Sequence, residues 1–171
     1  LYKDTQGGIW IGTYFGGVNY YNPTDDHTSY YEANPDMPHA LSFPVVGKMQ
    51  EDAEHNLWIC TEGGGLNFLD RQTRQFTRYV HNKGGLSGIG HNNLKCIWLR
   101  KETGQLYIGT HTGGLTIFDT RKKRAHTLKN SPDKANSLPS NVINDLQPYK
   151  GKLVLSTQAG IVAMNPETET F

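Results

Sequence analysis

The 171-residue sequence has almost no excess charge of either sign, because 17 lysine and arginine residues stand against 16 aspartate and glutamate residues. Binding of nucleic acid depends largely on an excess of basic residues that neutralise phosphates, so this balance argues against a nucleic-acid partner. Cysteine is also scarce. Cys60 and Cys96 are too few for a disulfide framework, and both are predicted to be free thiols, Cys60 as a small buried side chain.

Long apolar runs are missing as well. No stretch approaches the roughly 18 residues that a membrane-spanning helix requires, and the N-terminus shows no basic segment followed by an apolar one. We therefore expect no membrane contact from this segment. The seven histidines show no short paired spacing typical of zinc ligands. The sequence predicts neither a metal nor a cofactor.

Glycine and aromatic residues are plentiful, and this composition favours many short strands over helices. One pattern occurs four times, as GIWIGTYFGGVNYYN from Gly8, NLWICTEGGGLNFLD from Asn56, QLYIGTHTGGLTIFD from Gln105 and a degenerate KLVLSTQAGIVAMN from Lys152. A fixed period of this length indicates a repeat architecture.

Two sets of residues share the same period. The aromatic positions Trp10, Trp58 and Tyr107 are separated by 48 and 49 residues, and Val154 follows another 47 residues on. Leu41, Ile89 and Leu138 show the same intervals of 48 and 49. We predict that the first set anchors one repeat against the next. The second set is predicted to attach the connecting loops to the core.

Each repeat contains four short runs of aromatic and branched residues bounded by turn residues, which is typical of four strands. The expected strands are 9–13, 17–21, 28–32, 45–50, 57–61, 65–69, 76–80, 94–99, 106–110, 114–118, 125–129, 142–147, 153–157 and 161–164, and LYK at the N-terminus is expected to be the end of another. Four strands in 40 to 50 residues are typical of a β-propeller blade. The predicted fold is all-β, a propeller fragment of about 3.5 four-stranded blades.

The expected blades are residues 1–32, 33–80, 81–129 and an incomplete 130–171. About three and a half blades do not close a ring, since propellers usually have four to eight. The outer faces and an unpaired strand edge would then be exposed, and such surfaces drive association. We expect a homodimer of this segment, with a curved monomer or a ring containing further chain as the alternatives.

The repeats resemble the two-component regulator propeller repeat. The resemblance rests on the Leu-Trp-Ile-Gly-Thr core, the following Gly-Gly-Leu-Asn and the aromatic-Asp end, and on the linking segment NSLPSNVINDL, Asn136 to Leu146. In that family such repeats form the extracytoplasmic sensor region of hybrid histidine kinases. The resemblance implies a periplasmic segment of an inner-membrane sensor that responds to an oligosaccharide, with the kinase outside this segment.

The glycines after each threonine invite a phosphate-binding interpretation, but the residues after Gly65 are typical of a strand and not of the helix that a phosphate loop requires. GGLSGIG, Gly84 to Gly90, also lacks a helix after it. We expect these glycines to make turns. The basic run TRKKRAH, Thr120 to His126, is expected to be a solvated hairpin.

Between threonine and glycine the repeats differ freely, and the connections between blades are about a dozen residues long. In a propeller these tips and connections emerge on one face, where aromatic rings could hold sugar faces and polar groups could bind hydroxyls. The candidate oligosaccharide-binding residues are Tyr14, Phe15, Glu62, His91, Asn92, His111 and Asn141.

Two other functions stay open. Propeller faces suit protein-interaction platforms, and the fold alone does not exclude one. Propellers also host lyases and hydrolases. The sequence offers no carboxylate pair or nucleophile-base set at a recognisable spacing, so we predict no catalytic residue and no enzyme activity for this segment.

Overall fold

The computed structural model describes residues 1–81, 88–134 and 136–171. Within these ranges fifteen strands form four antiparallel sheets, and no helix is present. The all-β prediction is therefore confirmed for the described residues. The glycine-rich stretch Gly84 to Gly90 lies partly outside them.

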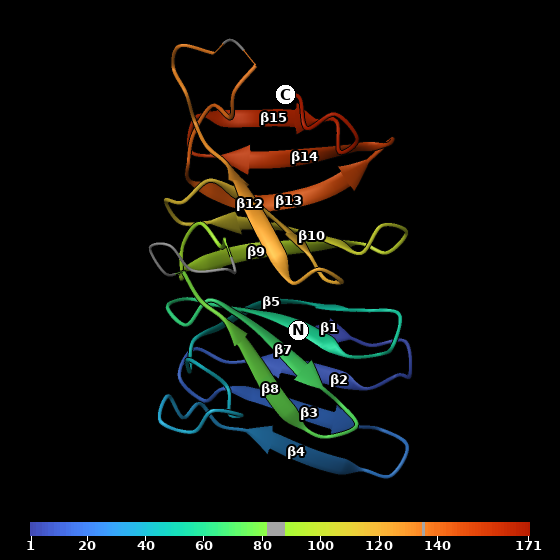
Figure 1. The fold of residues 1–171 in the computed structure, drawn as a ribbon. Helices are drawn as coiled ribbons and strands as arrows, with labels where there is room; N and C mark the ends of the chain where they lie inside the picture. Colours follow the sequence, from blue (N-terminus) through green and yellow to red (C-terminus); the bar gives the residue numbers. More distant parts are fainter. Residues whose placement is uncertain (82–87, 135) are drawn as a thin grey trace.

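The sheets follow the chain in order (Figure 1). The first sheet contains β1 (Tyr2–Lys3), β2 (Ile9–Gly12), β3 (Val18–Asn22) and β4 (His27–Tyr31). The second contains β5 (Val46–Glu51), β6 (Leu57–Thr61), β7 (Leu66–Asp70) and β8 (Gln75–Tyr79). The third contains β9 (Leu94–Arg100), β10 (Gln105–Thr110), β11 (Leu115–Asp119) and β12 (Arg124–Leu128), and the fourth contains β13 (Ile143–Tyr149), β14 (Lys152–Thr157) and β15 (Gly160–Met164).

Each predicted strand coincides with an observed one, with ends displaced by at most about two residues. The third strand of the first three repeats begins one residue later than predicted, because the glycine directly before it belongs to the turn. Gly17, Gly65 and Gly114 have φ angles of +66°, +75° and +86°. This left-handed conformation is unfavourable for residues with a Cβ atom.

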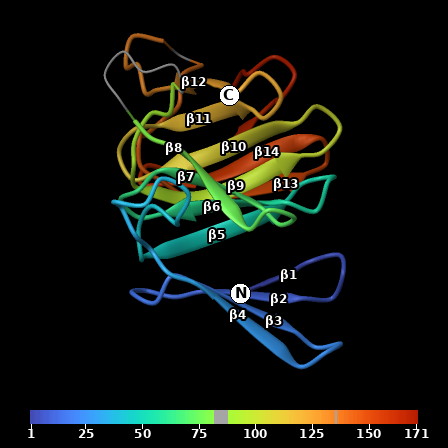
Figure 2. The ribbon, with the colours of Figure 1, turned by 60° about the horizontal axis from the view of Figure 1, so that its bottom comes forward.

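The first strands of successive sheets lie beside one another. β5 contacts β9, β9 contacts β13, and β1 contacts β5. The sheets are therefore arranged around a common line, with their first strands innermost (Figures 1 and 2). This arrangement is propeller-like.

The hydrophobic core lies between consecutive sheets and not within any one of them. Strand β6 illustrates the reason, since all of its residues are buried and successive side chains point to opposite faces. Leu57 and Ile59 belong to the cluster shared with the first sheet. Trp58 and Cys60 belong to the cluster shared with the third. A sheet covered on both faces accounts for the continuous apolar run in the sequence.

The predicted anchors are buried. Trp10, Trp58 and Tyr107 are 1%, 1% and 0% exposed. The ring of Trp58 lies 5.5 Å from that of Phe118 in the next sheet, so it packs between sheets as expected. The predicted attachment points of the connecting loops, Leu41, Ile89 and Leu138, are likewise buried.

The threonine of each repeat holds the turn that joins the second and third strands. Thr110 donates from Oγ1 to the Gly114 carbonyl at 2.8 Å and accepts from the Gly113 N–H at 2.8 Å. Thr61 makes the same two bonds with Gly65 and Gly64. The recurring threonine and glycine therefore shape a hairpin, as the sequence predicted.

Candidate functional site

The seven candidate oligosaccharide-binding residues are called the rim below. Two of them lie in the turn between β2 and β3. Tyr14 and Phe15 form an edge-to-face pair with ring centres 4.7 Å apart, and they are 69% and 74% exposed. Large aromatic side chains at this exposure are available for contact with a ligand or a partner.

Three further candidates surround Asn93, at the end of the connection between the second and third sheets. Glu62 pairs with Asn93 as an isolated bridge, and its carboxylate lies 2.9 Å from the Lys95 ammonium. His91 accepts the Asn93 N–H at its Nδ1 atom at 2.8 Å. The backbone N–H of His111 donates to the Asn93 carbonyl at 3.0 Å. The structure therefore brings Glu62, His91 and His111 together.

The side-chain oxygen of Asn93 is itself buried and lacks a hydrogen-bond partner among the described residues. An unpaired buried acceptor costs about 1–3 kcal/mol, so such groups are few in folded proteins. The sequence could have pointed to this residue, because the other repeats place a valine, Val45 or Val142, at the equivalent position.

The two candidate asparagines act within the fold. The Oδ1 atom of Asn92 accepts the His81 N–H at 2.6 Å, and its carbonyl accepts the Gly65 N–H at 2.9 Å. Asn141, one repeat later, accepts the Asn130 N–H at 2.7 Å and the Gly114 N–H at 3.0 Å. Each asparagine thus ties a connecting segment to the turn of the preceding repeat.

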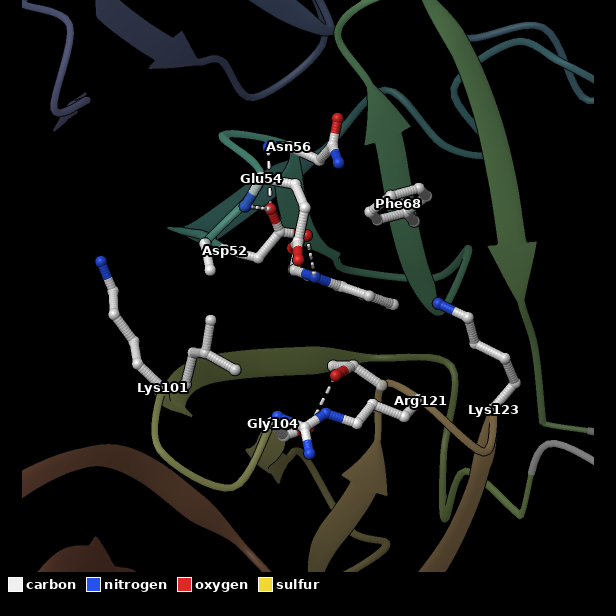
Figure 3. Close-up of a pocket in the computed structure, with 12 residues that line it drawn as sticks. Asp52, Glu54, Asn56, Phe68, Lys101, Gly104, Arg121 and Lys123 are labelled. Carbon is white, nitrogen blue, oxygen red and sulfur yellow. Dashed lines mark hydrogen bonds between the residues drawn. The ribbon is translucent and has the colours of Figure 1, made fainter.

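A pocket of about 310 Å³ opens at the other end of the strands, between the second and third sheets (Figure 3). The turn between β5 and β6 contributes Asp52 and Glu54 on one side of the gap. Lys101, Arg121 and Lys123 of the third sheet lie on the other side. The pocket wall is therefore acidic on one side and basic on the other, and none of the predicted rim residues lines it.

Asp52 is held in place by three donors. Its Oδ1 atom accepts the N–H groups of Glu54 and Asn56 at 3.1 and 2.9 Å, and its Oδ2 atom accepts the indole N–H of Trp58 at 3.2 Å. Partial burial raises the pKa of Asp52 above its ordinary value despite these bonds. Its main role is to fix the turn and the Trp58 ring.

Lys123 crosses from the third sheet to the second. Its ammonium lies 4.8 Å from the centre of the Trp58 ring and 5.1 Å from that of Phe68, within cation–π range. Burial of the ammonium lowers the pKa of Lys123. The basic run is thus more than the solvated hairpin that the sequence predicted, because one of its lysines packs against the neighbouring sheet.

One sequence pattern could have pointed to this end of the strands. An aspartate precedes the anchor tryptophan by six residues in the first two repeats, as Asp4 and Trp10 and as Asp52 and Trp58. In both pairs the carboxylate accepts the indole N–H, at 2.8 and 3.2 Å. The pattern marks a structural support beneath the aromatic anchors.

None of the described residues forms a helix long and apolar enough to cross a membrane. Over the same residues, no group of three or more histidine, cysteine, aspartate or glutamate side chains could hold a metal ion. Cys60 and Cys96 are free and buried, as expected.

Among solved structures, two extracellular domains are similar to this chain. A domain assigned to a hybrid two-component system from B. thetaiotaomicron is 29% identical with a TM-score of 0.80, over 99% of this chain and 22% of that one. A second such domain from the same organism is 27% identical with a TM-score of 0.75, over 98% of this chain and 23% of that one. The chain therefore spans less than a quarter of either relative.

A computationally designed protein shares the fold alone, with 12% identity and a TM-score of 0.65, over 95% of this chain and 87% of that one. Neither the models of protein families nor the curated protein sequences contain a match. The resemblance inferred from the repeats is nevertheless confirmed: in fold and in sequence, this chain is similar to extracellular domains of two-component systems.

Proposed function

We propose that the chain is a ligand-sensing β-propeller segment in the periplasmic part of an inner-membrane hybrid two-component sensor. The observation that carries this proposal is the 29% identity over 99% of the chain to an extracellular domain of such a system. In the proposed protein, ligand binding controls a kinase that lies outside this chain. The segment itself binds without catalysing a reaction.

Each sheet corresponds to one blade in this proposal, with about 3.5 blades over residues 1–32, 33–80, 81–129 and 130–171. The exposed face of the fourth sheet supports further packing. Ile161 is 80% exposed there, beside a shallow pocket of about 190 Å³ that Leu146 and Val154 also line. Further blades cover this face in a longer protein, and a second copy covers it when the chain is alone.

The oligosaccharide site lies at the rim. Tyr14 and Phe15 offer aromatic faces to sugar rings, while Glu62, His91 and His111 offer hydrogen-bonding groups around Asn93. Asn92 and Asn141 contribute by holding the connecting segments in place. The exposed aromatic pair also supports the alternative of a protein-interaction platform.

Calorimetric titration with a panel of neutral and acidic oligosaccharides tests the rim. Tyr14→Ala and Phe15→Ala are expected to weaken binding, whereas Tyr30→Ala, which removes an exposed tyrosine of β4, leaves it unchanged. Analysis of the recovered saccharides is expected to show no turnover. Equal binding by all three variants would refute the proposed oligosaccharide site at the rim, and cleavage of the saccharide would favour an enzyme.

Light scattering on this chain tests whether a second copy associates with it. A dimer is expected at tens of micromolar protein, a concentration range in which weak contacts become populated. A monomer that persists in this range would contradict the proposed association.

A further inference from the structure

The pocket between the second and third sheets carries two walls of opposite charge that do not pair with one another. Among the ion pairs of the described residues, none joins Asp52 or Glu54 to Lys101, Arg121 or Lys123. The same walls face each other across the gap in Figure 3. Opposite charges held apart across a concave site attract a small ligand that can contact both.

The groups available to that ligand differ between the walls. Asp52 already accepts three hydrogen bonds from the protein, so Glu54 is the available acceptor on the acidic wall. On the basic wall, the side chains of Lys101 and Arg121 are exposed and reach the pocket. The ammonium of Lys123 lies over the rings of the second sheet, where its charge interacts with those of Asp52 and Glu54. Lys101 and Arg121 are then the cations that remain for a ligand, and they favour one that carries a negative charge.

The floor of the pocket adds apolar surface. Trp58 and Leu99 lie beneath it, at 1% and 5% exposure, and the partly buried Phe68 supplies its accessible ring, with the Lys123 ammonium beside that ring. The volume of about 310 Å³ is at the lower end of the range for small-molecule sites. A single ring with polar substituents matches this size and this mixture of surfaces.

We propose that this pocket binds the carboxylate-bearing ring of an acidic saccharide, a uronate. The planar guanidinium of Arg121 and the ammonium of Lys101 bind the carboxylate. Glu54 accepts hydrogen bonds from ring hydroxyls, and the ring packs on the apolar floor. The saccharide class rests on the proposed function, whereas the site is separate from the rim and lies at the opposite end of the strands.

Titration with galacturonate, followed by calorimetry and by tryptophan fluorescence, tests this site. The unsubstituted protein is expected to bind galacturonate more tightly than galactose, its neutral counterpart, and more tightly than acetate, which lacks the ring. Lys101→Ala and Arg121→Ala are each expected to weaken galacturonate binding about tenfold, the equivalent of one lost charge-assisted contact.

Lys122→Ala is the matched control. Lys122 lies in the same turn as Arg121 and carries the same charge, but its side chain is 79% exposed and does not line the pocket. Its loss is expected to leave galacturonate binding unchanged, and circular dichroism checks that all variants fold.

The possible results separate this inference from the proposed function. Binding that is lost in the pocket variants but kept in Lys122→Ala and Tyr14→Ala supports the pocket. Saccharide binding that survives Lys101→Ala and Arg121→Ala would refute the proposed uronate site, and so would acetate binding as tight as that of galacturonate. Neither result would contradict the proposed oligosaccharide site at the rim. A complete lack of saccharide binding by the unsubstituted protein overturns both.

Discussion

The guanidinium of Arg71, from the turn between β7 and β8, lies 3.1 Å from the carboxylate of Asp4 in the first sheet. The same group lies 3.7 Å from Glu51, and both carboxylate side chains are completely buried. It also stacks over the Trp10 ring at 5.2 Å. Arg71 therefore faces two buried carboxylates at the junction of the first two sheets, and the His55 ring lies 3.0 Å from one of them, Glu51.

Arg71→Met is expected to destabilise the protein by about 3–5 kcal/mol, because it leaves the buried carboxylate of Asp4 without its cation. Arg74→Met provides the control, since Arg74 is exposed in the same turn and its replacement removes the same charge. Urea unfolding followed by circular dichroism measures both. Equal stabilities of the two variants would contradict the role of Arg71.

Trp58→Ala is expected to cost about 3–5 kcal/mol, as large aromatic truncations in a core do. The ring is 1% exposed and packs on Phe118 of the next sheet, so its loss opens a cavity between sheets. Tyr14→Ala, at an exposed position, should stay within about 0.5 kcal/mol of the unsubstituted protein. A small loss in the free energy of unfolding for Trp58→Ala, measured with urea, would argue against the role of Trp58 as an anchor between sheets.

Gly65→Ala and Gly151→Ala separate backbone strain from crowding. Both glycines have a φ angle of +75°, but a Cβ atom at Gly65 would lie 2.4 Å from the Tyr79 carbonyl, whereas none of the described atoms lies within 4 Å of one at Gly151. Gly151→Ala is expected to cost about 1–2 kcal/mol from the left-handed conformation alone. Gly65→Ala should cost at least about 1 kcal/mol more. Similar melting temperatures for the two variants would show that crowding at the turn is unimportant.

The two thiols are expected to resist labelling while the protein is folded. Burial raises the pKa of Cys96 to about 12 and raises that of Cys60 well above its ordinary value. A thiol whose pKa is higher in the folded state keeps its proton more tightly there. Stability is therefore retained below the ordinary pKa near 9 and falls as the pH rises from 9 toward 12.

Labelling with a thiol reagent at pH 7 and pH 8.5, in the absence and presence of urea, measures this protection. Both cysteines should react fully only in urea. Rapid labelling of either one under native conditions would show that its thiol is accessible, contrary to its burial in the structure.

The sequence by itself determined the local structure of this protein. Turns and strands depend on residues close together in the chain, so the period of 48 and 49 residues between Trp10, Trp58 and Tyr107 was sufficient to place the strands and the buried anchors. The aspartate six residues before each of the anchors Trp10 and Trp58 is visible in the sequence too, because that hydrogen bond is also local.

The tertiary structure alone decided which side chains meet across the sheets. Lys123 reaches Trp58, Arg71 reaches Asp4, and the two walls of the pocket come from turns of different sheets. These contacts depend on how one twisted sheet packs on the next. In both places a cation from the turn before the fourth strand covers the anchor tryptophan of the preceding sheet, but Arg71 and Lys123 occupy different positions of that turn. The sequence therefore directed attention to the variable turns of one face, while the pocket with two charged walls formed at the other.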